Sequence, residues 1–368
     1  MRKTIGLAVA VALAVLTPTS AYAGNGTAAA DGFGKVATLA VYGDSPYGIS
    51  PTDTAQFDAT PAFIDSINAD PAVSRAVHVG DIHSGKQFCT ESYDRSIAAL
   101  WTRFADPLVY TPGDNEWADC HKAAEGGGLG VDYADGNPAA NLALVRSVFF
   151  PRPGGTLGAK DHVTSQAREF DCAHPGDAAY VENVRWRQAK VVFVTLNIPG
   201  GSNNDQDPWF GQPLTTQQSD EVANRTGADL RWLAAAFAEA RGEDAKAVVI
   251  IDQADMWDLD GKTPDHLAGY DPFVAAVAAA TQDFGRPVLM FNGDSHVYRS
   301  DNPLAASDPL NSLHAPPGGT YDVANFHRVV VHGSTTPLEW LRLTVDPKAS
   351  NPASSEAFGP FSWARVQP

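Results

Sequence analysis

Four short apolar runs of the sequence each end in the same dipeptide, Gly-Asp. A single aspartate after a strand is typical of a turn or of a helix N-cap. Four repetitions favour a shared cation site instead, because crowded carboxylates repel one another unless a positive charge compensates them. Oxygen-rich clusters suit divalent cations such as Mg²⁺, Mn²⁺ or Ca²⁺. The four dipeptides are Gly43-Asp44, Gly80-Asp81, Gly113-Asp114 and Gly293-Asp294.

The runs before these dipeptides are rich in β-branched and aromatic residues, which is typical of buried strands. In an open α/β sheet the ligand site lies beyond the carboxyl ends of the strands, so all four aspartates would project to one edge. The glycine before each aspartate permits a sharp turn and a close approach to an ion. The predicted strands are 37–42, 75–79, 107–112 and 287–292.

Segments with helical periodicity lie between the predicted strands, and this alternation predicts an α/β architecture with mostly parallel pairing at its centre. The further predicted elements are helices at 93–104, 216–241 and 272–284 and strands at 191–197, 247–251, 328–331 and 340–345. Two stretches rich in Gly, Asn, Asp and Pro, 124–141 and 200–213, are predicted to be long loops within a single domain of residues 34–368.

The first residues are typical of a cleavable secretory signal. Arg2 and Lys3 supply a positive start, residues 5–16 form an uncharged apolar run, and Ala21-Tyr22-Ala23 offers a small-residue cleavage site. The apolar run is shorter than the roughly 20 residues that span a bilayer, so we expect export, to the medium, periplasm or cell envelope, with no stable membrane span left after cleavage. The expected division is a signal peptide at 1–23 and a flexible lead-in at 24–33.

The composition narrows the possible partners. The chain has 368 residues, 44% of them hydrophobic, and a formal net charge of −17. A surface this acidic repels phosphate backbones, so we expect no nucleic-acid-binding patch and no basic patch for anionic lipid.

Three cysteines are present, and their spacing matches no zinc motif. Cys89 follows Gly80-Asp81 and Cys120 follows Gly113-Asp114, so if both aspartates meet at one metal ion the two loops run side by side. We therefore predict a Cys89–Cys120 disulfide, which would also hold the two loops of the site together. The competing pair is Cys120 with Cys172, which is otherwise the free thiol.

At these residues the chain resembles the calcineurin-like metallophosphoesterases. The motifs of that family run Asp-x-His, Gly-Asp-x-x-Asp, Gly-Asn-His-Glu, a lone His and Gly-His-x-His, each at a strand end. The resemblance implies two packed mixed β-sheets flanked by helices, with the site at the carboxyl ends of the strands. The corresponding stretches, which extend over most of the chain from about residue 37 to 345, are Gly43-Asp44-Ser45-Pro46, Gly80-Asp81-Ile82-His83, Gly113-Asp114-Asn115-Glu116, Asp252-Gln253-Ala254 and Gly293-Asp294-Ser295-His296.

The chain departs from the family pattern mainly by losing histidines. Asp44 and Asp81 match the two carboxylates that bind and bridge two metal ions in the family. Pro46 replaces the histidine of Asp-x-His and cannot ligate. The remaining replacements are Asp114 for the metal-binding Asn, Asn115 for the catalytic His, Gln253 for the lone His and Asp294 for the first His of the last motif, which leaves His296 as the histidine that survives.

These replacements make the site oxygen-rich, which favours one or two Mg²⁺, Mn²⁺ or Ca²⁺ ions over a zinc or iron pair. The implied activity is hydrolysis of a small-molecule or polymer phosphoester, monoester or diester, by metal-activated water. The alternative is a catalytically silent binding or envelope-associated protein on the same scaffold. The expected metal ligands are Asp44, Asp81, Asp114, Asp294 and His296; the expected catalytic residues are Asn115, His83 and His296; Gln253 and Glu116 are expected beside them.

Overall fold

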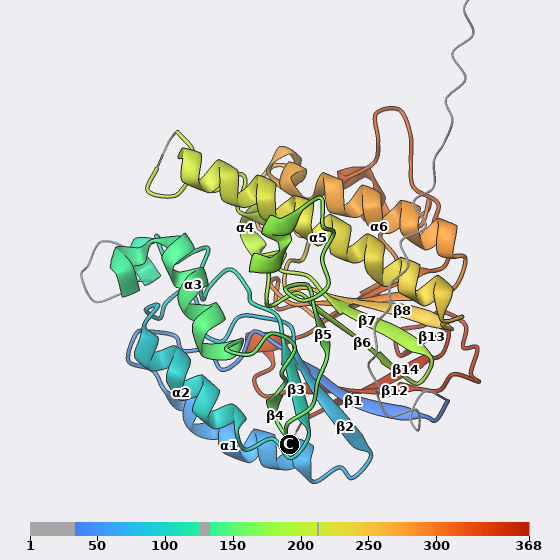
Figure 1. The fold of residues 1–368 in the computed structure, drawn as a ribbon, viewed down its shortest axis with the longest axis horizontal. Helices are drawn as coiled ribbons and strands as arrows, with labels where there is room; N and C mark the ends of the chain where they lie inside the picture. Colours follow the sequence, from blue (N-terminus) through green and yellow to red (C-terminus); the bar gives the residue numbers. More distant parts are fainter. Residues whose placement is uncertain (1–33, 126–132, 212, 368) are drawn as a thin grey trace, which may run out of the picture. The chain divides into compact units, whose positions relative to one another are not determined.

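Two mixed β-sheets pack against each other in the structure, which is a computed structural model (Figure 1). It describes residues 34–125, 133–211 and 213–367. The predicted signal peptide and lead-in lie outside the described residues, as does part of the predicted loop at 124–141.

Sheet 1 has seven strands, and its central strands β1, β2 and β3 run parallel, whereas the strands that flank them are antiparallel. In spatial order its strands are β13 (Ala357–Phe358), β14 (Phe361–Val366), β12 (Trp340–Val345), β1 (Ala37–Tyr42), β2 (Val73–His78), β3 (Pro107–Tyr110) and β4 (Leu157–Gly158).

Sheet 2 also has seven strands, and its parallel centre is formed by β11, β9, β8 and β7. In spatial order its strands are β10 (Arg299–Asp301), β11 (Phe326–Val330), β9 (Val288–Asn292), β8 (Ala247–Ile251), β7 (Val191–Thr195), β6 (Val184–Gln188) and β5 (Thr164–Ser165).

Alternating side chains divide the core into layers. Leu39 and Val41 of β1 face the space between the sheets, where they join Val249 and Ile251 of β8. The residues between them face outward against helices, which is the period-two pattern of a sheet buried on both faces.

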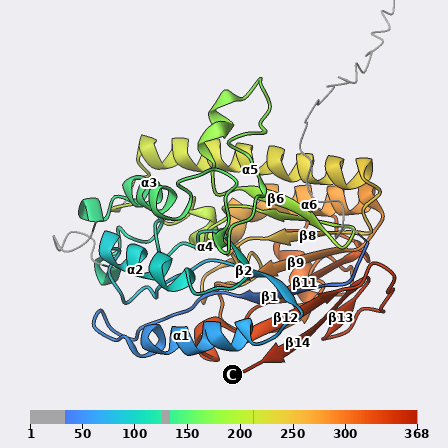
Figure 2. The same cartoon turned by 60° about the horizontal axis from the view of Figure 1, so that its bottom comes forward.

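Helices cover both outer faces of the sheet pair (Figures 1 and 2). Sheet 1 packs against α1 (Ala55–Asn68), α2 (Glu91–Trp101) and α3 (Pro138–Phe149), and sheet 2 against α5 (Thr216–Gly242) and α6 (Asp271–Phe284). A short α4 (Gly200–Asn203) lies in the loop after β7. The 3₁₀ segments are η1 (Ala123–Glu125), η2 (Tyr133–Gly136), η3 (Pro175–Ala179), η4 (Pro264–Tyr270), η5 (Pro309–Leu313) and η6 (Gly333–Thr335). No helix within the described ranges is long and apolar enough to cross a membrane.

The architecture confirms the predicted fold class. The predicted strands and helices are present, β1, β8 and β12 with the predicted ends and the others with shifted ends. Several elements were not foreseen, among them α1, which forms despite Pro61 within it. Helix α3 starts inside the predicted loop at 124–141, because the Asn137 side chain accepts a hydrogen bond from the Ala140 N–H and Pro138 suits a first helical turn.

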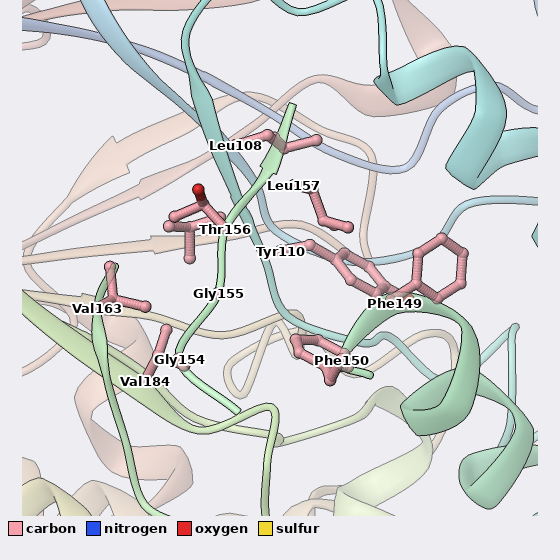
Figure 3. Close-up of a pocket in the computed structure, with 11 residues that line it drawn as sticks. Leu108, Tyr110, Phe149, Phe150, Gly154, Gly155, Thr156, Leu157, Val163 and Val184 are labelled. Carbon is pink, nitrogen blue, oxygen red and sulfur yellow. The ribbon is translucent and has the colours of Figure 1, made fainter. Parts of the chain in front are cut away.

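A small hollow lies where β3 packs against α3 (Figure 3). It measures about 10 Å³, barely the volume of one water, and its lining, which includes Leu108, Phe149 and Phe150, is mostly apolar. A hollow of this size and polarity does not bind a substrate.

Candidate metal centre

Each of the four predicted aspartates directly follows the Gly that ends its strand run, as the sequence indicates. Three of them adopt positive backbone φ angles: Asp44 at 48°, Asp81 at 61° and Asp294 at 70°. Residues other than glycine rarely adopt this conformation, and such strain is typical of functional sites.

Two of the preceding glycines are required by the close approach of the chains. A Cβ atom at Gly113 would lie 2.0 Å from Asp81 Oδ1, and one at Gly293 would lie 2.1 Å from Asp44 Oδ2. No side chain fits at these distances, so each glycine lets one loop pass against the carboxylate of another. The Gly-Asp repeat is therefore a packing requirement of the site.

Three candidate ligand side chains converge on one point. One ligand atom from each of Asp44, Asp81 and His296 lies within 4.8 Å of the other two. His296 Nε2 lies 3.4 Å from Asp44 Oδ1, and the His296 side chain keeps 26% of its surface exposed, whereas Asp44 is fully buried.

The residues of this group fit a divalent cation. Asp44 Oδ2 is buried and has no hydrogen-bond partner among the described residues, although a buried carboxylate oxygen ordinarily has one. An orphaned oxygen beside a second carboxylate and an imidazole is the donor set of a small, hard or borderline ion.

Tyr47 joins the group, although the sequence patterns did not single it out. Its hydroxyl donates to Asp81 Oδ2 at 2.6 Å, accepts from Asn115 Nδ2 at 2.8 Å and lies 3.2 Å from His296 Nε2. The Tyr47 and His296 rings also meet edge to face, with centroids 5.0 Å apart. Its place three residues after Asp44, directly after Pro46, is the one signal that the sequence offered.

Asp114 and Asp294 lie beside the group of three rather than in it. Asp114 Oδ1 accepts from Gln253 Nε2 at 2.8 Å, and Asp294 Oδ2 accepts from the Asp255 N–H at 3.1 Å. The same Gln253 nitrogen lies 3.2 Å from Asp81 Oδ2. Of the five predicted metal ligands, Asp81 and Asp114 thus share the donor Gln253, and Asp44 Oδ1 accepts from the Asp294 N–H at 2.9 Å.

Asn115 and Glu116 stabilise the turn that follows β3. Asn115 Nδ2 also donates to Asp81 Oδ2 at 2.9 Å. Glu116 Oε1 accepts from the Gly113 N–H at 2.7 Å and from the Tyr110 hydroxyl, so its carboxylate closes the turn that presents Asp114. Asn115 therefore contacts a candidate ligand directly, whereas Glu116 acts on the backbone.

Burial dominates the electrostatics of the cluster. It raises the pKa of Asp81 well above its ordinary value, and the charges of Asp114 and Glu116 raise it further. Burial, followed by the charge of Asp119, raises the pKa of Asp114 to about 8. Burial and the charge of Asp114 likewise raise the pKa of Asp294. Carboxylates crowded in this way favour a compensating positive charge.

The pKa values of the two histidines, His296 and His83, shift in opposite directions. Burial tends to lower the pKa of His296, but the hydrogen bond and charge of Asp44 outweigh it and raise that pKa. Burial lowers the pKa of His83 to about 4, so its ring is neutral near pH 7. His83 packs against Tyr93, and within the described residues no hydrogen bond or ion pair joins it to the four aspartates.

A disulfide lies next to the turn that carries Asp114 and Asn115. Cys89 and Cys120 are bonded, with Cα atoms 5.8 Å apart, and Cys172 is free and exposed. This confirms the predicted pairing over the alternative. Both sulfurs approach the carbonyl oxygen of Asn115, at 3.3 and 3.6 Å, so the bridge lies directly against the third strand end.

No protein-family model matches this chain, and no curated protein matches its sequence. Among solved structures, the chain is similar to purple acid phosphatase PPD1 from seeds of yellow lupin (Lupinus luteus), with a TM-score of 0.43 and 12% sequence identity. The match covers 85% of this chain and 50% of that one, so the chain spans about half the length of the lupin protein.

Proposed function

We propose that this protein is an exported, metal-dependent phosphoesterase that hydrolyses a phosphomonoester or phosphodiester. The observation that carries the proposal is the convergence of Asp44, Asp81 and His296, with the buried Asp44 Oδ2 left without a partner. The order of the strand-end motifs, which resembles that of the calcineurin-like metallophosphoesterases, supports phosphoester chemistry at this place.

Asp44, Asp81 and His296 would hold the ion, which would supply the positive charge that activates water and stabilises a phosphoryl group. The chain's own residues orient this set. Tyr47 and Asn115 fix the Asp81 carboxylate by donating to it, and His296, the most exposed of the three ligands, faces the side from which substrate arrives.

At the position where the family carries its catalytic histidine, the described site has no strong proton donor. Asn115 stands where the family carries a histidine, and an amide does not transfer a proton at ordinary pH. We therefore expect slow turnover, with phosphate orientation as the main contribution of Asn115. The substrate, a small molecule or a polymer phosphoester, would not be a nucleic acid, given the net charge of −17.

Export is part of the proposal. The Cys89–Cys120 disulfide is the kind of bond that persists in oxidising compartments, and the leader-like start of the chain agrees with it. Intact-mass measurement of protein recovered from outside the cytoplasm should give a chain that begins near Gly24. Retention of Met1 through Ala23 in that material contradicts the cleavable signal peptide.

A silent binding protein on the same scaffold is the second candidate, and three hydrogen bonds to one carboxylate oxygen favour it. Asp81 Oδ2 already receives hydrogen bonds from Tyr47, Asn115 and Gln253, so the cluster is partly compensated without an ion. Calorimetric titration with Mn²⁺, Mg²⁺ and Ca²⁺, together with assays on p-nitrophenyl phosphate and bis(p-nitrophenyl) phosphate, separates the two. Metal binding with turnover supports the enzyme, and neither metal binding nor turnover supports the silent protein.

A further inference from the structure

One side-chain amide joins two carboxylates of the candidate metal centre. Gln253 Nε2 lies 2.8 Å from Asp114 Oδ1 and 3.2 Å from Asp81 Oδ2, and Gln253 is fully buried. The residue follows β8 in sheet 2, whereas both aspartates follow strands of sheet 1. The amide therefore bridges the two sheets at the edge where the site lies.

The orientation of this amide is determined by its surroundings. Gln253 Oε1 accepts a hydrogen bond of 2.7 Å from the backbone N–H of Gly200. A backbone N–H can only donate, so the oxygen must face Gly200 and the NH₂ group must face the carboxylates. Gly80 adds a steric restraint, because a Cβ atom there would lie 2.7 Å from Gln253 Cβ and Cγ.

We infer that Gln253 takes the place of a second metal ion, so that the centre binds one ion, on the Asp44 side, and not two. The inference rests on the proposed function. An NH₂ group aimed between Asp81 and Asp114 occupies the lone pairs that a second ion would need, and it points partial positive charge at that ion's position.

The contrast within the centre supports a single ion. On the Asp44 side, Asp44 Oδ2 is buried and accepts from no donor in the part of the chain that the structure describes, and His296 offers a nitrogen ligand. On the Asp114 side, the carboxylates of Asp114 and Asp81 each accept a hydrogen bond from Gln253. A cation gains most where the lone pairs are free, so the first ion binds near Asp44 and finds no second site beside it.

The first test is the stoichiometry of the wild-type protein. Titration calorimetry with Mn²⁺ should give one ion per chain. The bound Mn²⁺ should show the hyperfine pattern of an isolated ion in its electron paramagnetic resonance spectrum. Two ions held about 3.5–4 Å apart, as in two-metal hydrolases, would couple magnetically and would overturn the inference while leaving the proposed function intact. No binding at all overturns the proposed function itself.

The second test replaces the amide by a carboxylate of equal shape. Gln253→Glu removes the donors and adds a ligand, so the stoichiometry should rise to two and Mn²⁺ should raise Tm more than it does in the wild type. Without metal, Tm should fall. Gln253→Met, which removes the donors and adds no charge, should lower Tm without metal and keep one ion.

Gln218→Glu is the matched control. Gln218 is also buried and makes three hydrogen bonds, but its partners are the backbone groups of Trp209, Asn204 and Asp207. Its substitution should lower Tm and leave the ion count at one. If Gln253→Glu still binds one ion, or if neither Gln253 variant lowers Tm without metal, Gln253 does not hold the place of an ion.

Discussion

The candidate centre has two halves, one around Asp44 and one around Asp114, whose carboxylates have different hydrogen-bond partners. In the first half, the His296 imidazole lies beside Asp44. Asp44 is fully buried, and its Oδ2 has no hydrogen-bond partner among the described residues. In the second half, the Asp114 carboxylate accepts a hydrogen bond from the side-chain amide of Gln253, which also donates to Asp81. One half is arranged to receive a cation, and the other is already compensated by hydrogen-bond donors.

This difference explains what the loss of histidines does. A histidine at the position of Asn115 or Gln253 would offer a lone pair to a metal ion, whereas an amide NH₂ offers hydrogen atoms to neighbouring carboxylates. Amides at these two positions therefore offer neither an imidazole ligand nor an imidazole proton donor, and they stabilise the neighbouring aspartates instead. The centre keeps its acidic residues without requiring an ion at each of them.

The largest expected effect comes from removing a ligand from the half around Asp44, the open half. Asp44→Asn should weaken Mn²⁺ binding by more than about 100-fold, since even the outer partners of metal ligands are worth about 10–100-fold. Asp114→Asn should weaken it less than tenfold, because Asp114 belongs to the compensated half. Both values follow from calorimetric titration, and equal losses in the two variants remove the distinction between the halves.

Asp252→Asn is the control for this comparison. Asp252 is a fully buried aspartate whose two carboxylate oxygens have no partner among the described residues, but it does not belong to the converging group. Its substitution should leave the Mn²⁺ affinity within twofold of the wild type.

The sequence predicted the acidic part of the centre because its signal is local. Each aspartate follows an apolar run and a glycine, and parallel strands bring their carboxyl ends to one edge. Tyr47 and the N–H of Gly200 escaped prediction, because their roles depend on where distant loops fold back. His83 lies two residues after Asp81, yet its ring packs against Tyr93, which shows that neighbours along the chain need not point to one site.

The fold was predictable for the same reason. The parallel central strands read as continuous apolar runs, and β1, β8 and β12 have the predicted ends. Short edge strands such as β4 and β13, with two residues each, carry too few side chains for a pattern. Helix α1 includes Pro61, a residue that ordinarily ends a helix, so its periodicity gave no clear signal.

The next effect concerns the stability of the compensated half. Cys89→Ser with Cys120→Ser opens a loop whose ends are 31 residues apart, which should lower the free energy of unfolding by about 3–4 kcal/mol in the chain-entropy model. Chemical denaturation measures it, with Cys172→Ser as the control that should change little, since Cys172 is free and exposed. A loss below about 1 kcal/mol would mean that the loops by Asn115 are held mainly by other contacts.

A gain of activity should follow when an acid is restored to the compensated half. General acid catalysis contributes about 10²–10⁴-fold, so Asn115→His should raise kcat on p-nitrophenyl phosphate at least tenfold with Mn²⁺ present. His83→Gln should leave kcat unchanged, because the His83 ring is buried and, within the described residues, no hydrogen bond or ion pair joins it to the aspartates. No turnover in either the wild type or Asn115→His favours the silent binding protein.

The smallest expected effect concerns Tyr47, whose hydroxyl lies between the two halves. It donates to Asp81 Oδ2 and lies close to His296 Nε2, so it holds both ligands in the position that an ion needs. Tyr47→Phe removes that hydroxyl alone and should weaken Mn²⁺ binding about tenfold, the lower end of the range for partners of metal ligands.

Tyr93→Phe gives the matched comparison. The Tyr93 hydroxyl donates to the Ile82 carbonyl oxygen at 3.1 Å, so its removal disturbs the same loop without touching a carboxylate. Titration of both variants under one set of conditions isolates the contact with the ligands. Equal losses would assign Tyr47 to loop packing, whereas tighter binding in Tyr47→Phe would show that the hydroxyl competes with the ion for Asp81. The second result would place Tyr47 in the compensated half, beside Gln253.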